Sequence, residues 1–395
     1  MTKIMHIITT LGPAGAETML CKTISGMDRS LFENEVVSLT GILDLARNME
    51  RIGVRVRSLG MKTAVPNPLL LMRLAGWIRE SKPDVIHTWM YHANLIGALA
   101  ARVAGNVPVV WAIHHNGFDS RVDKRRTMLV SRACASLSRK IPARIVFCSE
   151  ASLKLHKTLG YAHDKLEVIP NGFDLEQVKP DPAARISLRN ELGLPADALL
   201  IGLAARFHPH KDHRNFIRAA ALLHGQKPEV HFVLCGLDIT WQNAQLAAWI
   251  DAVGLRGCCH LLGVRRDMPR LFAGMDIATT TSRSEAFPVV IGEAMACGTP
   301  CVVTDVGDSA MIVGQTGVVV GPGDPEALAK AWQSLIDAGP EVRLRLGMAA
   351  RQRVQEHFSL PMIVERYQAL YAELAAGAPQ ARFASSFSQC APRAH

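Results

Sequence analysis

The stretch IATTTSRSEAFPVVIGEAMACGTPCVVT, residues 277–304, contains one complete strand–helix–strand unit. The runs IATTT (277–281) and PCVVT (300–304) are short and rich in β-branched residues, which is typical of buried strands. Between them, Pro288 suits the first turn of a helix and Gly298 suits its end. Strands joined through a helix lie parallel in one sheet, so this stretch predicts an α/β fold.

The same stretch carries two glutamates that an apolar helix does not explain. Glu285 follows the first strand, and Glu293 lies in the second turn of the expected helix. Burying a carboxylate is costly unless a partner compensates it. A buried arginine or backbone donors would give Glu293 a purely structural role. We favour a ligand, because one carboxylate can accept hydrogen bonds from both neighbouring hydroxyls of a ribose.

Short β-rich runs alternate with helical stretches along the whole chain, as in parallel sheets. We expect strands at 3–11, 34–40, 54–59, 84–89, 108–113, 144–149 and 166–170, and in a second series at 199–205, 230–236, 259–263, 277–281, 300–304 and 317–321.

A segment rich in proline, glycine and charge, from Pro170 to Ala198, separates the two series. We therefore expect two doubly wound, Rossmann-like domains at 1–178 and 179–359, with the boundary near 175–195. A helix at about 360–376 is expected to pack back onto the first domain, and 377–395 forms a loose tail. Such sheets bind ligands at the carboxyl ends of their strands, so two in tandem make a cleft between them.

The composition is that of an ordinary globular protein, with 395 residues, 49% hydrophobic and 20% charged. Arginines interrupt the best apolar windows, so no membrane span is expected. The N-terminus has the pattern of a strand and not of a signal peptide, which predicts a cytoplasmic protein. Nine scattered cysteines without a CxxC pair indicate reduced thiols rather than disulfides or a zinc site.

The net charge of +9 derives in large part from residues 121–144, where basic residues flank apolar ones in an expected helix. This pattern is typical of a solvated helix face. The alternative is a basic patch of the protein that faces the anionic lipids on the inner face of the plasma membrane. It has no aromatic interleaving and no nucleic-acid signature, so we do not expect a nucleic-acid partner.

Two cations lie where the second series begins. Arg206 follows the strand at 199–205, and Lys211 opens the next helix, so both could hold a diphosphate. A surface salt bridge is the alternative. The nearby histidines do not predict a metal, because no carboxylate or cysteine cluster completes a site. The chain also contains no DxD motif, so we expect that no metal is required.

Two strand ends of the first series carry further candidates. The stretch LGPAGAE (11–17) brings Gly12, Gly15 and Glu17 to the start of a helix, as a plain tight turn or as a contact with phosphate or sugar. His114 directly follows the strand PVVWAI (108–113), and a lone histidine at a strand end is as often structural as functional.

Several of these motifs, in this order, resemble one family. Glu285 and Glu293, with seven residues between them, resemble the EX7E signature of retaining glycosyltransferases of glycosyltransferase family 4, which have the GT-B fold. The resemblance covers nearly the whole chain and extends to LGPAGAE (11–17), VIPNGFDLEQVKP (168–180), RFHPHKDHRNFIRAA (206–220) and HLLGVRRDMPRLFAGMDI (260–277).

The resemblance implies a role for each candidate. Glu293 would bind the donor ribose and Glu285 the transferred sugar, while Arg206 and Lys211 would hold the diphosphate. His114 would be the cleft histidine, although His115 is one position away. The other implied donor contacts are Gly15, Val264, Arg265, Ala286, Phe287 and Val289, of which Val264 and Arg265 would lie against the base.

Two departures from the family pattern affect the donor site. The family commonly has EGFG where this chain has EAFP, so Ala286 restricts the backbone and Pro288 removes one amide. Ala14 also stands where a second glycine is usual in the N-terminal loop.

The resemblance implies a retaining, metal-independent glycosyltransferase without a cofactor. It would move a hexose or N-acetylhexosamine from a nucleotide sugar, UDP-linked or else GDP-mannose, to a glycan or lipid-linked acceptor in bacterial surface polysaccharide or glycoconjugate synthesis. The alternatives are a non-hydrolysing UDP-sugar epimerase and a non-catalytic nucleotide-sugar-binding scaffold. A Rossmann dehydrogenase is a weaker alternative still, because the glycine fingerprint and its acidic partner are missing.

Overall fold

The computed structural model of the protein describes residues 1–12, 15–41, 44–61, 67–115 and 125–377. This part divides into two compact units, Met1–Gly172 together with the last helix, α15 (Leu360–Ala375), and Phe173–Ser359. The tail expected at 377–395 lies outside the described residues after Gly377.

The first unit is built on a parallel sheet of seven strands in the order β3-β2-β1-β4-β5-β6-β7. The strands are β1 (Thr2–Ile8), β2 (Phe32–Ser38), β3 (Arg55–Ser58), β4 (Val85–Trp89), β5 (Val109–Ile113), β6 (Arg144–Phe147) and β7 (Leu166–Val168). The order runs outward from β1 and β4 in opposite directions, so the chain reverses its winding between these two neighbours. Such a switch point is where doubly wound sheets bind ligands.

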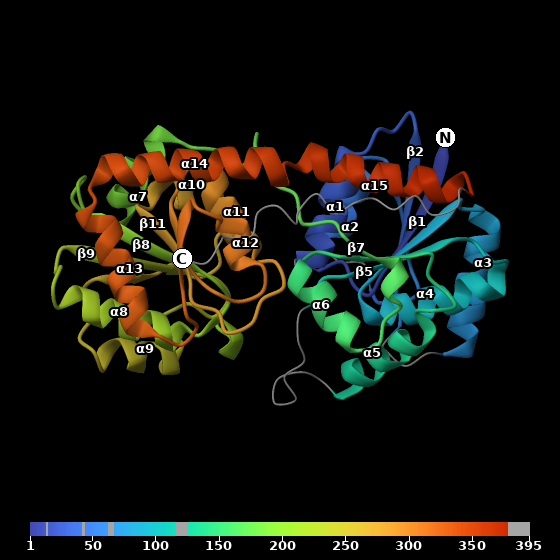
Figure 1. The fold of residues 1–395 in the computed structure, drawn as a ribbon, viewed down its shortest axis with the longest axis horizontal. Coiled ribbons are helices and arrows are strands. Elements are labelled where there is room, and N and C mark those ends of the chain that lie inside the picture. The colour runs from blue at the N-terminus through green and yellow to red at the C-terminus, as the bar shows by residue number, and fades with distance from the viewer. Residues whose placement is uncertain (13–14, 42–43, 62–66, 116–124, 378–395) are drawn as a thin grey trace. The chain divides into compact units, whose positions relative to one another are not determined.

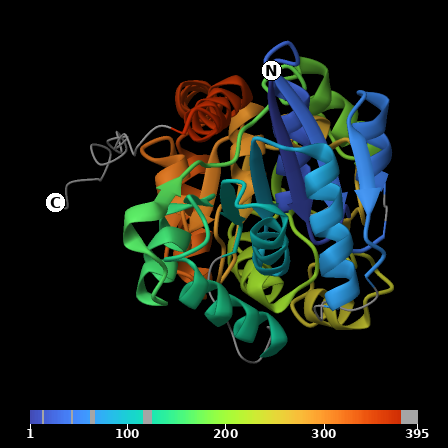
Figure 2. The same ribbon diagram turned by 90° about the vertical axis from the view of Figure 1, so that its right-hand side faces the viewer.

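Helices cover both faces of this sheet (Figures 1 and 2). Ile4 and Ile8 of β1 face one hydrophobic cluster, and Met5 and Ile7 face the other, because side chains alternate along a strand. The first cluster is completed by α1 (Gly15–Gly26), α2 (Asp44–Arg51) and α15, and the second by α3 (Pro68–Ser81), α4 (Tyr91–Ala104) and α5 (Arg125–Leu137). Helix α6 (Glu150–Thr158) and the short helix η1 (His163–Lys165) follow β6.

Helix α15 is far from β1 and β4 in sequence but packs against both. Its Tyr371 hydroxyl lies 2.6 Å from His87 Nδ1 on β4, and Glu373 accepts a hydrogen bond from Arg144 at 2.6 Å. Tyr367 and Tyr371 are fully buried. The last helix is therefore part of the core of the first unit.

The second unit contains a parallel sheet of six strands in the order β10-β9-β8-β11-β12-β13. The strands are β8 (Leu199–Ala204), β9 (Val230–Cys235), β10 (Cys259–Leu261), β11 (Ile277–Thr280), β12 (Cys301–Thr304) and β13 (Gly317–Val320). The helices are α7 (Pro182–Leu192), η2 (Pro209–Lys211), α8 (His213–His224), α9 (Ala244–Asp251), α10 (Met268–Gly274), α11 (Val289–Ala296), α12 (Ser309–Val313), α13 (Pro325–Asp337) and α14 (Pro340–Phe358). The predicted α/β class, with two doubly wound sheets, is confirmed.

The boundary between the units lies at Gly172–Phe173, a few residues before the expected boundary after 178. The Phe173 ring is fully buried and stacks on Phe287 at 6.2 Å, so it belongs to the core of the second unit. The charge and proline content of 174–198 marks the entry into α7 and not the change of unit.

Among the described helices, none is long and apolar enough to cross a membrane. Of the basic stretch 121–144, residues Arg125–Leu137 form α5, and the first four residues lie outside the described residues.

Candidate active site

Two neighbouring strands of the second unit bring the predicted cations and carboxylates together. Strands β8 and β11 pair in parallel, with Ile277 beside Ile201, so their carboxyl ends meet at one edge of the sheet. The segment 205–212 follows β8 and carries Arg206 and Lys211, and the segment 281–288 follows β11 and carries Glu285. This edge is also the switch point of the second sheet, since the strand order runs outward from β8 and β11.

These two segments are joined by hydrogen bonds. Thr281 Oγ1 donates to the Lys211 carbonyl at 2.8 Å, and the Arg283 backbone N–H donates to the His210 carbonyl at 2.7 Å. Arg283 Nε also donates to Asp212 Oδ2 at 2.5 Å. The two segments therefore hold each other in place at the end of the sheet.

Lys211 and Glu285 form an ion pair. Lys211 Nζ donates to Glu285 Oε1, and Ser282 Oγ donates to the same oxygen at 2.6 Å. The side chains are 23% and 13% exposed, so both charges are partly shielded from water. The salt bridge that the sequence left as an alternative for Lys211 is thus present, although its partner is the other predicted site residue.

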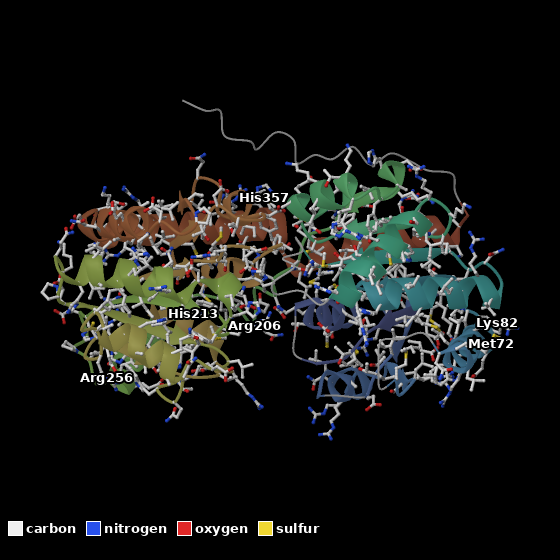
Figure 3. All side chains as sticks on the ribbon, turned by 90° about the horizontal axis from the view of Figure 1, so that it is seen from below. Met72, Lys82, Arg206, His213, Arg256 and His357 are labelled. Atoms are coloured by element: carbon white, nitrogen blue, oxygen red, sulfur yellow. The ribbon has the colours of Figure 1, made fainter. Side chains whose placement is uncertain are left out.

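Arg206 is exposed, and among the described residues it has no ion-pair partner. Its backbone lies against the turn after β9, where Gly236 has a φ of 142° and a Cβ would be 2.2 Å from the Ala205 carbonyl oxygen. Only glycine fits there, so the turn fixes the start of the segment that carries Arg206. Figure 3 labels Arg206 together with His213, the first residue of α8.

Helix α11 places Glu293 in its second turn, as the sequence predicts, and the residue is half-buried. Pro288 is the N-cap and not the first helical residue. The first backbone N–H groups of α11, which begins at Val289, have no partner within the helix, so the helix can stabilise an anion at this end.

Two predicted donor contacts lie just before α11. Ala286 is half-buried, and its carbonyl accepts a hydrogen bond from the Asp308 N–H at 3.0 Å. The Phe287 ring is buried and also contacts Phe358, 5.7 Å away in an edge-on arrangement. The Phe287 side chain therefore packs in the core, so only the backbone of this residue can face a donor.

The turn after β10 carries Val264 and Arg265. Val264 is 67% exposed. Arg265 is bidentate to two carboxylates, with contacts to Asp267 at 2.8 and 2.7 Å and to Glu191 at 2.5 and 3.3 Å. The guanidinium of Arg265 holds the pKa of Asp267 below its usual range. Most N–H groups of Arg265 are therefore used within the protein. The sequence did not suggest this network of Arg265 with Asp267 and Glu191.

The first unit places His114 directly after β5. Its ring stacks on Trp89 with 5.3 Å between centroids and a 29° angle between the planes. The residue is half-buried, but its Nε2 is enclosed and has no hydrogen-bond partner among the described residues. Burial lowers the pKa of His114 to about 4, so the ring is neutral at pH 7. The neighbouring His115 ring stands edge-on to Tyr91 at 5.9 Å.

The loop LGPAGAE is described at both ends but not at residues 13–14. Gly15 begins α1, and a Cβ there would meet nothing within 4 Å among the described atoms. Glu17, in the first turn of the helix, is buried, and this burial raises its pKa. At the start of α1, Gly15 thus has space around it, and the Glu17 carboxylate is buried.

Comparison with known proteins agrees with this geometry. A family model described as Glycosyltransferase Family 4 matches residues 13–177, and one described as Glycosyl transferases group 1 matches residues 184–353. The chain belongs to glycosyltransferase family 4. The predicted family, and with it the GT-B fold, is confirmed.

Two curated relatives and one crystal structure illustrate the similarity. The enzyme is 25% identical over 309 residues to the UDP-Gal:alpha-D-GlcNAc-diphosphoundecaprenol alpha-1,3-galactosyltransferase of Escherichia coli, covering 77% of this chain and 79% of that protein. It is 29% identical over 309 residues to the D-inositol 3-phosphate glycosyltransferase of Xylanimonas cellulosilytica, covering 71% and 69%. Anabaena Alr3699/HepE in complex with UDP-glucose matches with a TM-score of 0.81 and 25% identity, covering 95% of this chain and all of that one.

Two residues of this glycosyltransferase were missed in the sequence. Met90, between β4 and α4, has a φ of 71° and a ψ of 159°, which is uncommon for a residue with a side chain. Its sulfur lies 3.4 Å from the His114 backbone nitrogen. Asp212 has a φ of 46° directly after Lys211. Strained residues gather at functional sites, but nothing in a single sequence marks them.

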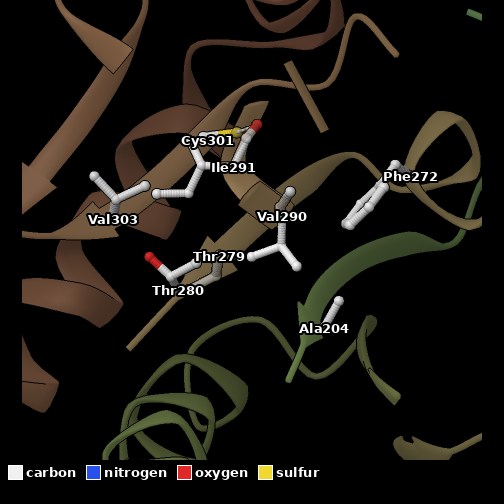
Figure 4. Close-up of a pocket in the computed structure, with 9 residues that line it drawn as sticks. Ala204, Phe272, Thr279, Thr280, Val290, Ile291, Cys301 and Val303 are labelled. Atoms are coloured by element: carbon white, nitrogen blue, oxygen red, sulfur yellow. Dashed lines mark hydrogen bonds between the residues drawn. The ribbon is translucent and has the colours of Figure 1, made fainter. Parts of the chain in front are cut away.

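A small cavity of about 10 Å³ lies beneath α11 in the second unit of the glycosyltransferase (Figure 4). Its lining is mostly apolar and includes Ala204, Thr280 and Ile291. A space of this size accommodates one water molecule at most, far less than a nucleotide needs. The cavity is therefore a packing gap under the helix and not the donor site.

Proposed function

We propose that this glycosyltransferase transfers a hexose or N-acetylhexosamine from a UDP-sugar to a glycan or lipid-linked acceptor, with retention of the anomeric configuration. The observation that carries the proposal is the juxtaposition of Arg206, Lys211 and Glu285 at the carboxyl ends of β8 and β11. This arrangement offers positive charge to a diphosphate and a carboxylate to a sugar.

The relatives support UDP as the nucleotide. The name of the Escherichia coli relative contains UDP-Gal, and the Anabaena crystal structure contains UDP-glucose. In our proposal the Glu293 carboxylate binds the ribose hydroxyls and the turn at Val264 lies against the base. GDP-mannose is the second candidate donor.

The chemistry requires stabilisation of the departing phosphate. As the bond from the sugar C1 to the phosphate oxygen breaks, negative charge grows on the diphosphate, where Arg206, Lys211 and the start of α11 would stabilise it. The acceptor hydroxyl attacks C1 from the same face, and its proton passes to the departing phosphate oxygen. Glu285 and the neutral His114 would orient the sugar. These charges come from the protein, so we propose that no metal is needed.

The acceptor is proposed to be membrane-linked. The name of the Escherichia coli relative contains a diphosphoundecaprenol-linked sugar. Helix α5 of the first unit exposes Arg125, Arg126 and Arg132 around Leu129, which is 63% exposed. Such a face can rest on anionic lipid, so we propose that the enzyme works at the cytoplasmic face of the membrane in surface polysaccharide or glycoconjugate synthesis.

To test this, the purified enzyme is incubated with UDP-galactose, UDP-glucose or UDP-N-acetylglucosamine as the donor. Each donor is supplied with and without a polyprenyl-diphosphate-linked N-acetylhexosamine as the acceptor. We expect release of UDP only with acceptor, a product with the donor's anomeric configuration by NMR, and the same rate after EDTA treatment. Conversion of the donor without acceptor would instead indicate an epimerase. Binding of UDP without turnover of any donor would indicate a scaffold, and loss of activity in EDTA that Mg²⁺ restores would contradict metal independence.

A further inference from the structure

An ion pair beside Lys211 has no part in the chemistry proposed above. Asp212, the residue after Lys211, accepts a hydrogen bond on Oδ2 from Arg283 Nε at 2.5 Å. The Asp212 side chain is 6% exposed, whereas that of Arg283 is 64% exposed. A buried carboxylate on one segment of the site is thus held by an arginine from the other segment.

Asp212 also has an unusual backbone. Its φ of 46° and ψ of 53° lie in the left-handed region, which favours glycine. Its other carboxylate oxygen accepts from the Asn215 N–H at 3.3 Å and so caps α8. A residue persists in such a conformation only when its surroundings hold it there. The cap and the ion pair with Arg283 are side-chain contacts that do so, and the Asp212 N–H also donates to the Pro209 carbonyl at 3.3 Å.

Lys211 is fixed by the same pair of segments. Its carbonyl accepts from Thr281 Oγ1, and its Nζ donates to Glu285. The Asp212–Arg283 pair is a further link between the same two segments, one residue after Lys211 in the sequence. We propose that this pair is a positioning device that holds the Lys211 ammonium at the end of β11 before a donor arrives. This inference rests on the proposed function, in which Lys211 binds the diphosphate.

The physical reason is preorganisation. A charge that is already in place when the diphosphate arrives costs no rearrangement of the protein. Without the Asp212–Arg283 pair, the segment 205–212 would sample other conformations, and binding would have to select the competent one. UDP, which carries the diphosphate, should therefore bind less tightly.

The decisive variant is Asp212→Gly. Glycine adopts a φ of 46° without strain and is accepted at a helix N-cap, so we expect the melting temperature of the unliganded protein to be unchanged or higher. We expect the Kd for UDP, measured by calorimetry, to rise roughly tenfold. A purely structural role would lower the melting temperature and leave the Kd unaltered.

Two arginine variants complete the test. Arg283→Ala should weaken UDP binding as Asp212→Gly does, and Arg283→Lys should restore part of the affinity because it keeps the charge but loses the planar group. Arg218→Ala, which removes an exposed arginine from α8, is the control and should leave both the Kd and the melting temperature unchanged.

Lys211→Ala separates this inference from the proposed function. If Lys211→Ala weakens UDP binding while Asp212→Gly and Arg283→Ala bind UDP within twofold of the wild type, the positioning role is wrong and the site assignment stands. If Lys211→Ala also binds UDP normally, the assignment of the diphosphate site itself is wrong.

Discussion

Lys211 and Glu285 bind each other in this structure, so a diphosphate would share the lysine with a carboxylate. An ammonium can donate three hydrogen bonds, and the pair is partly exposed, so Lys211 can serve both partners at once. Arg206 has no such carboxylate partner among the described residues. The two cations therefore differ, with Arg206 open to solvent and Lys211 already oriented.

We predict that Arg206→Ala and Lys211→Ala each lower kcat by about 10²-fold, the scale for losing one preorganised group that stabilises developing charge. Steady-state kinetics with the UDP-sugar that proves active would measure this. Lys330→Ala, on the exposed side of α13, is the control and should retain the wild-type kcat. An unchanged kcat in both site variants would remove these residues from the mechanism.

The sequence predicted which residues end strands, but not which side chains meet there. Arg206, Lys211 and Glu285 were identifiable because each follows a β-rich run. The pairing of Lys211 with Glu285 depends on the register of β8 against β11, which a local pattern does not encode. The same limit applies to Phe287, whose ring packs on Phe173, more than a hundred residues earlier in the chain.

Helix α11 carries Glu293, and its position depends on one glycine. A Cβ at Gly292 would lie 2.1 Å from Cζ of the buried Phe173 ring. Such a contact is impossible without movement, so any larger residue at this position would push α11 away from the core and Glu293 with it. Packing against Phe173 therefore restricts position 292, which lies between the two glutamates, to glycine.

We predict that Gly292→Ala destabilises the protein by about 1–3 kcal/mol, the usual cost of overpacking, and weakens UDP binding because Glu293 is displaced. Thermal or urea unfolding and calorimetry with UDP would measure the two effects. Gly76→Ala is a matched control in α3, where a Cβ would meet nothing within 4 Å. That variant should be slightly more stable, since alanine is the better helix former.

The existence of each strand was more predictable from the sequence than the point where one unit ends and the next begins. β-rich runs predicted the strands of both sheets, and the central strands were the clearest because they are apolar and buried on both faces. The change of unit at Gly172–Phe173 was not predicted, because composition marks the exposed segment after it, whereas the Phe173 ring marks where the new core begins.

At the scale of the whole molecule, positive charge is unevenly distributed. Residues 67–115 and 125–141, which include the helix layer α3–α5, contain nine lysines and arginines but only two acidic residues, Glu80 and Asp84. Glu80 is already paired with Arg57. Among the described residues this layer therefore has a net positive charge, and α5 adds the exposed Leu129.

We predict that the enzyme floats with vesicles containing phosphatidylglycerol but not with vesicles of phosphatidylcholine alone, and that added salt reduces this binding. The double variant Arg126→Glu/Arg132→Glu should lose it, because each basic residue near an anionic surface contributes about 1 kcal/mol. Arg214→Glu/Arg218→Glu makes the same change in net charge on the exposed face of α8 and should still float. Equal flotation of the two double variants would show that overall charge, and not the face of α5, attracts the protein to lipid.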